Sequence, residues 1–261
     1  MNIWESIAMG AVQGLTEFLP VSSSGHLEIA GAIFGLNESN NLWFTVAVHL
    51  ATVLSSIVVF RREILEIVRG VFKFSFNDQT VYLLNIVISM LPILFVGLMF
   101  KDEVEALFTD NLVFVGSMLL VTAGLLTFSH FVRPQLRPIT PKRAFMIGVA
   151  QAVAVLPGLS RSGATISAAL LQGVKREEAA RFSFLMVIIP ILGISFLDIV
   201  GSSSGVAGNF DTTVLAGFIT AFLTGLFACK VMIRLVSRGK LIWFAAYCVL
   251  AGLTSIIVGV F

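Results

Sequence analysis

Charged residues are scarce in this sequence: they make up 12% of 261 positions, while 57% are hydrophobic and the mean hydropathy is +0.97. Soluble domains carry about 25% charged residues. The shortage of polar surface excludes a water-soluble globule, so we expect an integral membrane protein surrounded by a lipid bilayer. Cysteine is also rare, and Cys229 and Cys248 lie in apolar segments, which predicts no disulfide framework. The net charge of +2 says little on its own, and no nucleic-acid partner is expected.

Apolar runs of about 20 residues recur along the chain, and this is the length that a helix needs to cross a bilayer. Two further stretches, residues 3–34 and 144–173, are interrupted by Pro, Ser and Gly. Each piece beside an interruption has about 10–16 residues, too few to cross as a helix. We predict an all-α polytopic membrane protein with two re-entrant helix-loop-helix hairpins and six transmembrane helices, at roughly 42–60, 82–100, 112–131, 182–200, 213–233 and 241–261.

The basic residues gather on one side of this arrangement. Arg and Lys are frequent after the first, third and fifth predicted spans and after the second hairpin, whereas the other side has only Lys101. Because positive residues mark the cytoplasmic side, both termini are predicted to lie outside the cytoplasm. Arg161 belongs to neither group, since it lies inside the second hairpin.

The two interrupted stretches resemble each other. Gly10-Ala11-Val12-Gln13 returns as Gly148-Val149-Ala150-Gln151, and each copy precedes three predicted spans. Because three spans separate the two copies, the second hairpin would enter the membrane from the opposite side to the first. We predict one membrane domain built as an inverted-topology repeat, residues 1–131 and 139–261, with its functional site near the midplane where the broken helices meet. Chance similarity between two breaks rich in Gly and Ser is the alternative.

The first hairpin gathers an amide, an acid, hydroxyls and an imidazole, namely Gln13, Glu17, Ser22, Ser23, Ser24 and His26. Gln13 and Glu17 are four residues apart and share one helix face. The serines stand where the returning helix needs N-caps, and its N–H groups form an anion site. Ionisable residues inside a membrane are functional by default, so Glu17 and His26 are candidates for chemistry. The alternatives are a solvated carboxylate, a packing histidine and serines that only cap.

The second hairpin carries a cation at its break, in Ser160-Arg161-Ser162-Gly163-Ala164-Thr165. The guanidinium fork of Arg161 suits phosphate oxygens. A cation at a helix N-terminus is unfavourable unless an anion also binds there, which favours a phosphate group. A structural ion pair with Glu17 is the alternative. Elsewhere in the spans, we expect His49 and Asn85 to form hydrogen bonds between helices.

Two long motifs resemble the signatures of a known family. The stretch from Gln13 to His26, containing EFLPVSSSGH, and LPGLSRSGATIS, from Leu156 to Ser167, are similar to those of the undecaprenyl-diphosphatase (bacitracin-resistance) family. The resemblance covers essentially the whole chain. It implies hydrolysis of undecaprenyl diphosphate to undecaprenyl phosphate and inorganic phosphate in the bacterial inner membrane, on the outer side of the midplane. This reaction recycles the lipid carrier for peptidoglycan and other cell-wall polymers and confers bacitracin resistance.

The resemblance also implies roles for single residues. Glu17, His26 and Arg161 would be catalytic, with Ser23 as the nucleophile, and the residues that bind substrate would be Gln13, Ser22, Ser24, Ser160, Ser162, Gly163 and Thr165. Many members have glutamate where this chain has Gln13, so Glu17 would carry any essential carboxylate role alone.

Two further expectations concern the ligands. Mg²⁺ or Ca²⁺ would arrive with the diphosphate, with Glu17 as a candidate ligand and no tightly bound cofactor. The rival function is a polyprenyl-phosphate transporter or flippase, because inverted repeats with broken helices are also a transporter architecture. The sequence does not fix an oligomeric state.

Overall fold

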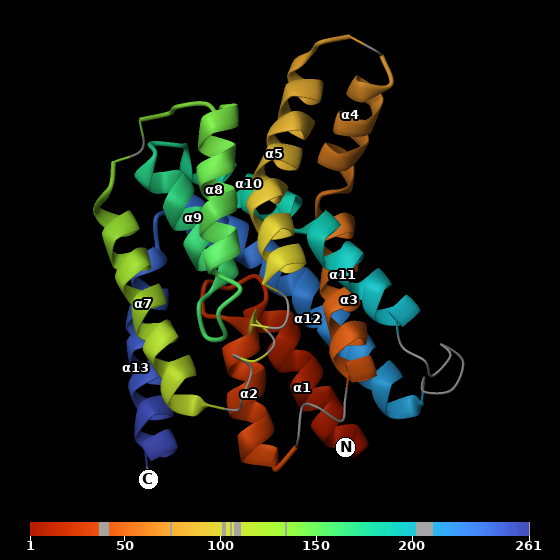
Figure 1. Cartoon of the computed structure of the whole chain (residues 1–261), viewed down its shortest axis with the longest axis vertical. Helices are drawn as coiled ribbons and strands as arrows, with labels where there is room; N and C mark the ends of the chain where they lie inside the picture. The colour runs from red at the N-terminus through yellow and green to blue at the C-terminus, as the bar shows by residue number, and fades with distance from the viewer. Residues whose placement is uncertain are drawn as a thin grey trace.

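The computed structural model describes residues 1–36, 42–73, 75–100, 103–104, 106, 111–133, 135–201 and 211–260. Over these residues the chain is helical, with no β-strand and one isolated bridge between Arg137 and Val174. The helices (Figure 1) are α1 (Ile3–Thr16), α2 (Ser23–Phe34), α3 (Leu42–Val59), α4 (Arg61–Val71), α5 (Asp78–Met99), α7 (Leu112–Phe131), α8 (Pro141–Val153), α9 (Arg161–Leu171), α10 (Arg176–Met186), α11 (Ile188–Gly201), α12 (Thr212–Ser237) and α13 (Leu241–Val260).

Among the described residues, five helices are long and apolar enough to cross a membrane: α5, α7, α12, α13 and a segment Arg176–Leu197 that joins α10 to most of α11. A sixth span results if α3 and α4 count as one, although the chain bends by 74° between them. The predicted all-helical, multi-pass membrane protein is confirmed at this level. The bend was not anticipated: α3 ends at Val59, and after a turn at Phe60 the chain continues as a second helix, α4, whose polar face begins with Arg61 and Arg62. Lys101 lies outside the described residues.

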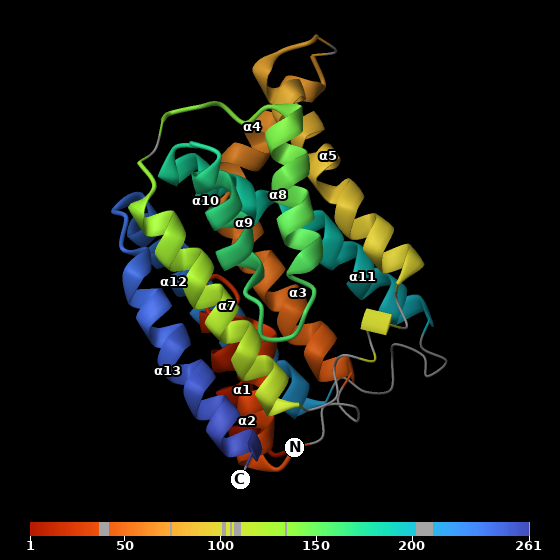
Figure 2. The same cartoon turned by 60° about the vertical axis from the view of Figure 1, so that its left-hand side comes forward.

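Two pairs of short helices, α1 with α2 and α8 with α9, form hairpins. Each hairpin begins at a capped N-terminus: Asn2 and Glu5 form a capping box at α1, and Thr140 caps α8 ahead of a proline at its first position. Figures 1 and 2 show α1 and α2 in the half of the molecule near both termini and α8 and α9 in the opposite half. The loops of the two hairpins meet near the middle of the helix bundle.

Each hairpin packs its entering helix against a long helix from the other half of the sequence. Helix α1 lies along α12, and α8 lies along α5. Both contacts are close because a glycine is present: a Cβ on Gly10 would collide with the backbone of Gly217, and one on Gly148 with the backbone of Ser89. Small residues allow this approach where van der Waals packing drives helix association.

The remaining long helices also pair between halves. Helix α7 lies along α13, where Gly116 and Gly252 face each other, and α3 contacts both α11 and α12. The packing of α1 on α12 is thus matched by the packing of α8 on α5, and α7 pairs with α13. The hairpin loops are enclosed by these pairs.

The segments rich in Arg and Lys come together at the end opposite the termini. Nδ1 of His130, near the end of α7, lies 3.1 Å from the carbonyl oxygen of Gly239, and Arg176 Nη2 donates to the His130 carbonyl at 3.3 Å. At the end near the termini, Ser255 Oγ donates to Leu112 O at 3.0 Å. Figures 1 and 2 show both termini at this latter end.

An aromatic cluster holds Phe18, the residue after Glu17, in place. The ring of Phe18 packs edge-on against Phe184 at 5.7 Å between centroids, and Phe184 contacts Phe60 at 6.1 Å. All three rings are buried. Because protein interiors are close-packed, this cluster holds the chain at the end of α1 in one position relative to α10 and the bend after α3.

Candidate active site

The returning helices of the two hairpins start in the same way. Ser22 caps α2 by accepting from the Gly25 N–H at 3.3 Å, and Ser160 caps α9 by accepting from the Gly163 N–H at 3.1 Å. Each cap hydroxyl also lies near the serine two residues on, at 3.3 Å for Ser22–Ser24 and 3.4 Å for Ser160–Ser162. The site therefore contains two capped helix N-termini, and helix N-termini attract anions.

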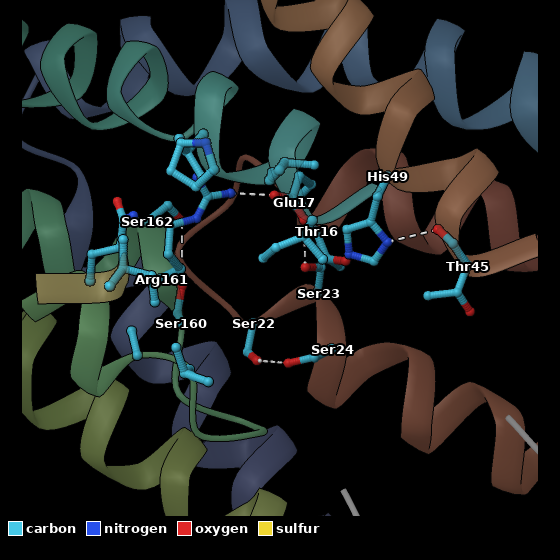
Figure 3. A pocket seen from close by; sticks show the side chains of 18 of the residues that line it. Thr16, Glu17, Ser22, Ser23, Ser24, Thr45, His49, Ser160, Arg161 and Ser162 are labelled. Atoms are coloured by element: carbon cyan, nitrogen blue, oxygen red, sulfur yellow. Dashed lines mark hydrogen bonds and ion pairs between the residues drawn. The ribbon is translucent and has the colours of Figure 1, made fainter. Parts of the chain in front are cut away.

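Glu17 joins the two hairpins. It is the C-cap residue of α1 and is buried. Its Oε1 forms an ion pair with Nη2 of Arg161, while Oε2 accepts from Ser23 Oγ at 2.7 Å and from Gln13 Nε2 at 3.0 Å. Figure 3 shows Glu17 between Ser23 and Arg161. Loss of either charged partner would leave an uncompensated buried charge, which is strongly destabilising.

Arg161 is the first residue of α9, so its positive charge adds to that of the helix N-terminus. Its side chain is only 18% exposed, and Nη1 has no hydrogen-bond partner among the described residues. A buried donor without a partner is costly. An anionic ligand would satisfy this donor, and Glu17 alone does not.

These residues line a cavity of about 320 Å³ at the level of the hairpin loops. Its polar side is formed by Glu17, Arg161 and the serines of both breaks, and its apolar side by residues of α5 and α11, among them Ile93, Ile191 and Ile194. Ile194 is also 57% exposed on the outer surface of the bundle. The cavity therefore connects charged groups with the apolar exterior.

The comparison with known families agrees with this site. The sequence model of the family described as "Bacitracin resistance protein BacA" matches residues 6–254. The chain belongs to the BacA family. The family resemblance inferred from the two motifs is thereby confirmed.

Curated relatives cover the same length. The chain is 53% identical over 262 residues to an undecaprenyl-diphosphatase of Bacteroides fragilis (strain YCH46), covering 99% of this chain and 98% of the relative. It is 54% identical over 260 residues to an undecaprenyl-diphosphatase of Parabacteroides distasonis, with 98% of each chain covered. A relative of that name in Methanococcus vannielii is 41% identical over 257 residues, covering 95% of this chain and 97% of the relative.

The structure of this BacA-family chain brings most of the predicted site residues to the cavity. The residues that line it are Glu17, Ser22, Ser23, Ser24, Ser160, Arg161 and Ser162. Gln13 stands behind them and donates to Glu17. Gly163 and Thr165 do not line the cavity: Gly163 packs against Ser160 and Thr122, and Thr165 Oγ1 lies 2.6 Å from Ser183 Oγ. These two residues hold α9 in place.

His26 does not line the cavity in this structure. Its Nδ1 lies 2.7 Å from the Ser22 carbonyl oxygen, and its Nε2 lies 2.7 Å from the hydroxyl of Tyr247 on α13. The two rings stack at 5.5 Å between centroids. A catalytic role for His26 stays a prediction, and in this arrangement its ring joins α2 to α13.

Five polar residues that the sequence analysis did not assign to the site also line the cavity, namely Thr16, Thr45, Ser195, His49 on α3 and Gln151 on α8. His49 does not bond between helices as expected, since its Nδ1 contacts Thr45 O of its own helix at 2.9 Å. Asn85 donates to Ile139 O at 2.9 Å, which joins α5 to the segment before α8 and not to another helix. Gln151 is buried with Oε1 unpartnered among the described residues. The repeat pointed to Gln151, since it matches Gln13, but no local pattern marked His49.

The described residues contain no group of three or more His, Cys, Asp or Glu side chains placed to hold a metal ion. Glu17 is the carboxylate among the residues that line the cavity. Both of its oxygens already accept hydrogen bonds or pair with Arg161. Protein sites for Mg²⁺ or Ca²⁺ draw mainly on carboxylate oxygens, and the described lining supplies them from Glu17 alone.

Proposed function

We propose that this chain is an undecaprenyl-diphosphate phosphatase, which hydrolyses undecaprenyl diphosphate to undecaprenyl phosphate and inorganic phosphate. The observation that carries the proposal is the buried guanidinium of Arg161 at the N-terminus of α9, which lines the cavity and has one nitrogen unpartnered among the described residues. Guanidinium groups and helix N-termini both bind phosphate oxygens. The names of the curated relatives supply the reaction.

The cavity suits a molecule with a charged head and an apolar tail. The diphosphate would lie between Arg161 and the N-termini of α2 and α9, where donors face developing phosphoryl charge. The polyprenyl tail would follow the side formed by Ile93, Ile191 and Ile194 toward the bilayer. A soluble nucleotide would gain nothing from that apolar side, so the geometry favours a lipid diphosphate.

Ser23 is the proposed nucleophile. Its Oγ donates to Glu17 Oε2 at 2.7 Å, so the carboxylate can accept the serine proton as Oγ attacks the terminal phosphorus. The bond from that phosphorus to the bridging oxygen breaks, and undecaprenyl phosphate leaves with the electron pair. Water then releases inorganic phosphate from Ser23. Direct attack by water on the diphosphate is the competing route, and trapping the phosphoryl group on Ser23 separates the two.

A divalent cation is proposed to accompany the substrate. Because Glu17 is the one carboxylate in the described lining of the cavity, Mg²⁺ or Ca²⁺ would be held largely by the phosphate oxygens, with Glu17 as a candidate protein ligand. The cation would neutralise charge on the diphosphate. Arg161 would bind the oxygens that the cation leaves exposed.

We also propose the finer architecture predicted from the sequence: six spans and two re-entrant hairpins in an inverted repeat, residues 1–131 and 139–261. The reciprocal packing of α1 on α12 and of α8 on α5 supports it, as does the pairing of α7 with α13. The basic residues would face the cytoplasm, with both termini outside and the site toward the outer side of a bacterial inner membrane. There the enzyme would recycle the carrier lipid for cell-wall polymers and confer bacitracin resistance.

The test is release of inorganic phosphate from undecaprenyl diphosphate by the purified protein in detergent. We expect the parent to be active and Glu17→Ala and Arg161→Ala to lose about 10²–10³-fold in kcat/KM, because the first removes the base proposed for Ser23 and the second removes a donor to the reacting phosphate. The matched control is Arg181→Ala, since Arg181 is 39% exposed on α10 and pairs only loosely with Glu177 at 3.9 Å. A folded parent that releases no phosphate, with or without Mg²⁺ or Ca²⁺, would contradict the proposal and favour lipid transport.

A further inference from the structure

The chain has three histidines, and all three rings meet a backbone carbonyl through Nδ1. The distances are 2.7 Å for His26 to Ser22 O, 2.9 Å for His49 to Thr45 O and 3.1 Å for His130 to Gly239 O. A carbonyl can only accept, so Nδ1 carries the hydrogen in each ring. The lone pair of the neutral imidazole then lies on Nε2.

The three histidines differ in what Nε2 meets. The Nε2 of His26 lies 2.7 Å from the Tyr247 hydroxyl, which can donate to it. His130 sits near the end of α7, away from the residues that line the cavity. His49 lines the cavity, and its Nε2 has no hydrogen-bond partner among the described residues. Figure 3 shows its ring between Thr45 and the group formed by Glu17 and Ser23.

The other charged groups of the cavity are poorly suited to remove a proton from water. Arg161 does not lose its proton in proteins. Glu17 is occupied on both oxygens, by Arg161 on Oε1 and by Ser23 and Gln13 on Oε2. The lining residues from α5, α8 and α11 include no titratable side chain. On α12, Gly217 packs against Phe44 and Gly225 against Ser55, and the stretch between these glycines contains no titratable side chain. The charged Lys230 and Arg234 lie further along that helix.

We propose that His49 is the base that removes a proton from the water that attacks phosphorus, an inference that rests on the phosphatase function proposed above. The water oxygen forms a bond to phosphorus, and one water proton moves to Nε2 of His49. The bond from phosphorus to the leaving oxygen breaks, and this oxygen keeps the electron pair. The proton on His49 then passes to the phosphate product or to solvent.

The role is the same in both routes. In the phosphoserine route the leaving oxygen is Ser23 Oγ, which takes back the proton that Glu17 accepted. In direct hydrolysis the leaving oxygen belongs to undecaprenyl phosphate, whose charge needs no proton. Thr45 acts through its carbonyl oxygen, which fixes the tautomer of His49 and turns Nε2 toward the cavity.

The test compares the parent with His49→Gln, His49→Ala and the matched control His130→Gln, using undecaprenyl diphosphate as substrate. Glutamine at 49 can keep a donor to Thr45 O but cannot accept a proton from water. We expect His49→Gln to lower kcat by about 10²–10⁴-fold with little change in KM. His130→Gln should keep the parent kcat, because His130 does not line the cavity.

Imidazole added to His49→Ala separates a base from a packing residue. We expect kcat of this variant to rise with imidazole concentration, whereas His130→Gln and the parent should not respond. Unchanged kcat in His49→Gln would overturn the proposal. So would loss of kcat in folded His49 variants without rescue by imidazole, because that result assigns a packing role. A folded parent without phosphate release contradicts the proposed function itself and removes the basis of this inference.

Discussion

Ser23 and Arg161 are the first residues of α2 and α9, and each donates a hydrogen bond to a different oxygen of Glu17. They occupy equivalent positions, because the N-cap serines before them and the glycines after them match. The two breaks therefore supply different chemistry, a hydroxyl from one and a cation from the other. Neither hairpin alone forms the site, and Glu17 is the residue that couples them.

Replacing Arg161 by lysine tests whether the guanidinium fork matters beyond its charge. Lysine keeps the charge but cannot contact Glu17 and a phosphate oxygen with two fixed nitrogens. The loss of one charge-assisted hydrogen bond, about 1.5–3 kcal/mol, corresponds to a fall in kcat/KM of about 10- to 100-fold. Phosphate release at varied substrate concentration measures this. Arg181→Lys on the exposed face of α10 is the control. Equal activity of the two variants would show that the guanidinium of Arg161 acts only through its charge.

Ser23→Ala tests the nucleophile. The 2.7 Å bond from Ser23 Oγ to Glu17 favours attack by the serine, so we expect kcat to fall by about 10²-fold or more. Substrate labelled at the terminal phosphate and quenched in acid should leave label on the parent protein. More label should collect on His49→Gln, in which water attack is slowed, and none on Ser23→Ala. Full activity of Ser23→Ala would exclude the phosphoserine route.

The close approach of α1 and α12 predicts a difference between two glycines. A Cβ on Gly14 would collide with the backbone of Ala221 and lie 2.9 Å from Gly225 N, whereas a Cβ on Gly124 in α7 meets nothing within 4 Å. We expect Gly14→Ala to lower the free energy of unfolding by about 1–3 kcal/mol. Gly124→Ala should be neutral or stabilising by up to about 1 kcal/mol, because alanine favours helix. Thermal unfolding in detergent measures both, and equal Tm values would be inconsistent with this packing.

Much of the fold followed from the sequence because bilayer physics is restrictive. Apolar runs of spanning length became helices, and the breaks at Pro20 and Pro157 became the loops of two hairpins. The bend after Phe60 did not follow, since the apolar run simply ends where the polar face of α4 begins. Helix direction at that point depends on the neighbours, such as the contact of Phe60 with Phe184, and not on local composition.

The site was predictable where its residues are adjacent in sequence and not where distant helices contribute. Glu17 and the serines were found from one hairpin, and Arg161 from the cost of a cation at a helix N-terminus. The surroundings of His26 depend on Tyr247, which only the packing of α13 brings to α2. His49 likewise reaches the cavity because α3 packs between α11 and α12. A single histidine in an apolar run gives no sign of the direction it faces.

The backbone at Ser22 is unusual, which leads to a stability prediction. Its φ is 69°, a conformation that favours glycine, whereas the equivalent cap Ser160 has φ −66°. Alanine at either position loses the cap, at a cost of about 0.5–2 kcal/mol, and glycine costs only a few tenths. At Ser22 glycine also relieves strain. We therefore expect the difference in Tm between the glycine and alanine variants to be larger at position 22 than at 160, and equal differences would argue against strain.

Gln13→Glu tests how a divalent cation enters the reaction. Gln13 Nε2 donates to Glu17 Oε2 at 3.0 Å, and a glutamate there would place a second carboxylate beside the first. Two buried carboxylates repel each other unless a proton or a cation lies between them. With oxygen ligands from both, Mg²⁺ or Ca²⁺ would be held by the protein as well as by the diphosphate.

When a chelator removes divalent cations, we expect phosphate release by Gln13→Glu to fall by a larger factor than release by the parent. On addition of Mg²⁺ or Ca²⁺, release by Gln13→Glu should also recover by a larger factor. Gln13→Leu is the control, because it removes the donor to Glu17 without adding charge. It should lower activity and leave the response to cation as in the parent. If Gln13→Glu and the parent respond identically, the cation does not bind near Glu17, and its ligands are the substrate oxygens alone.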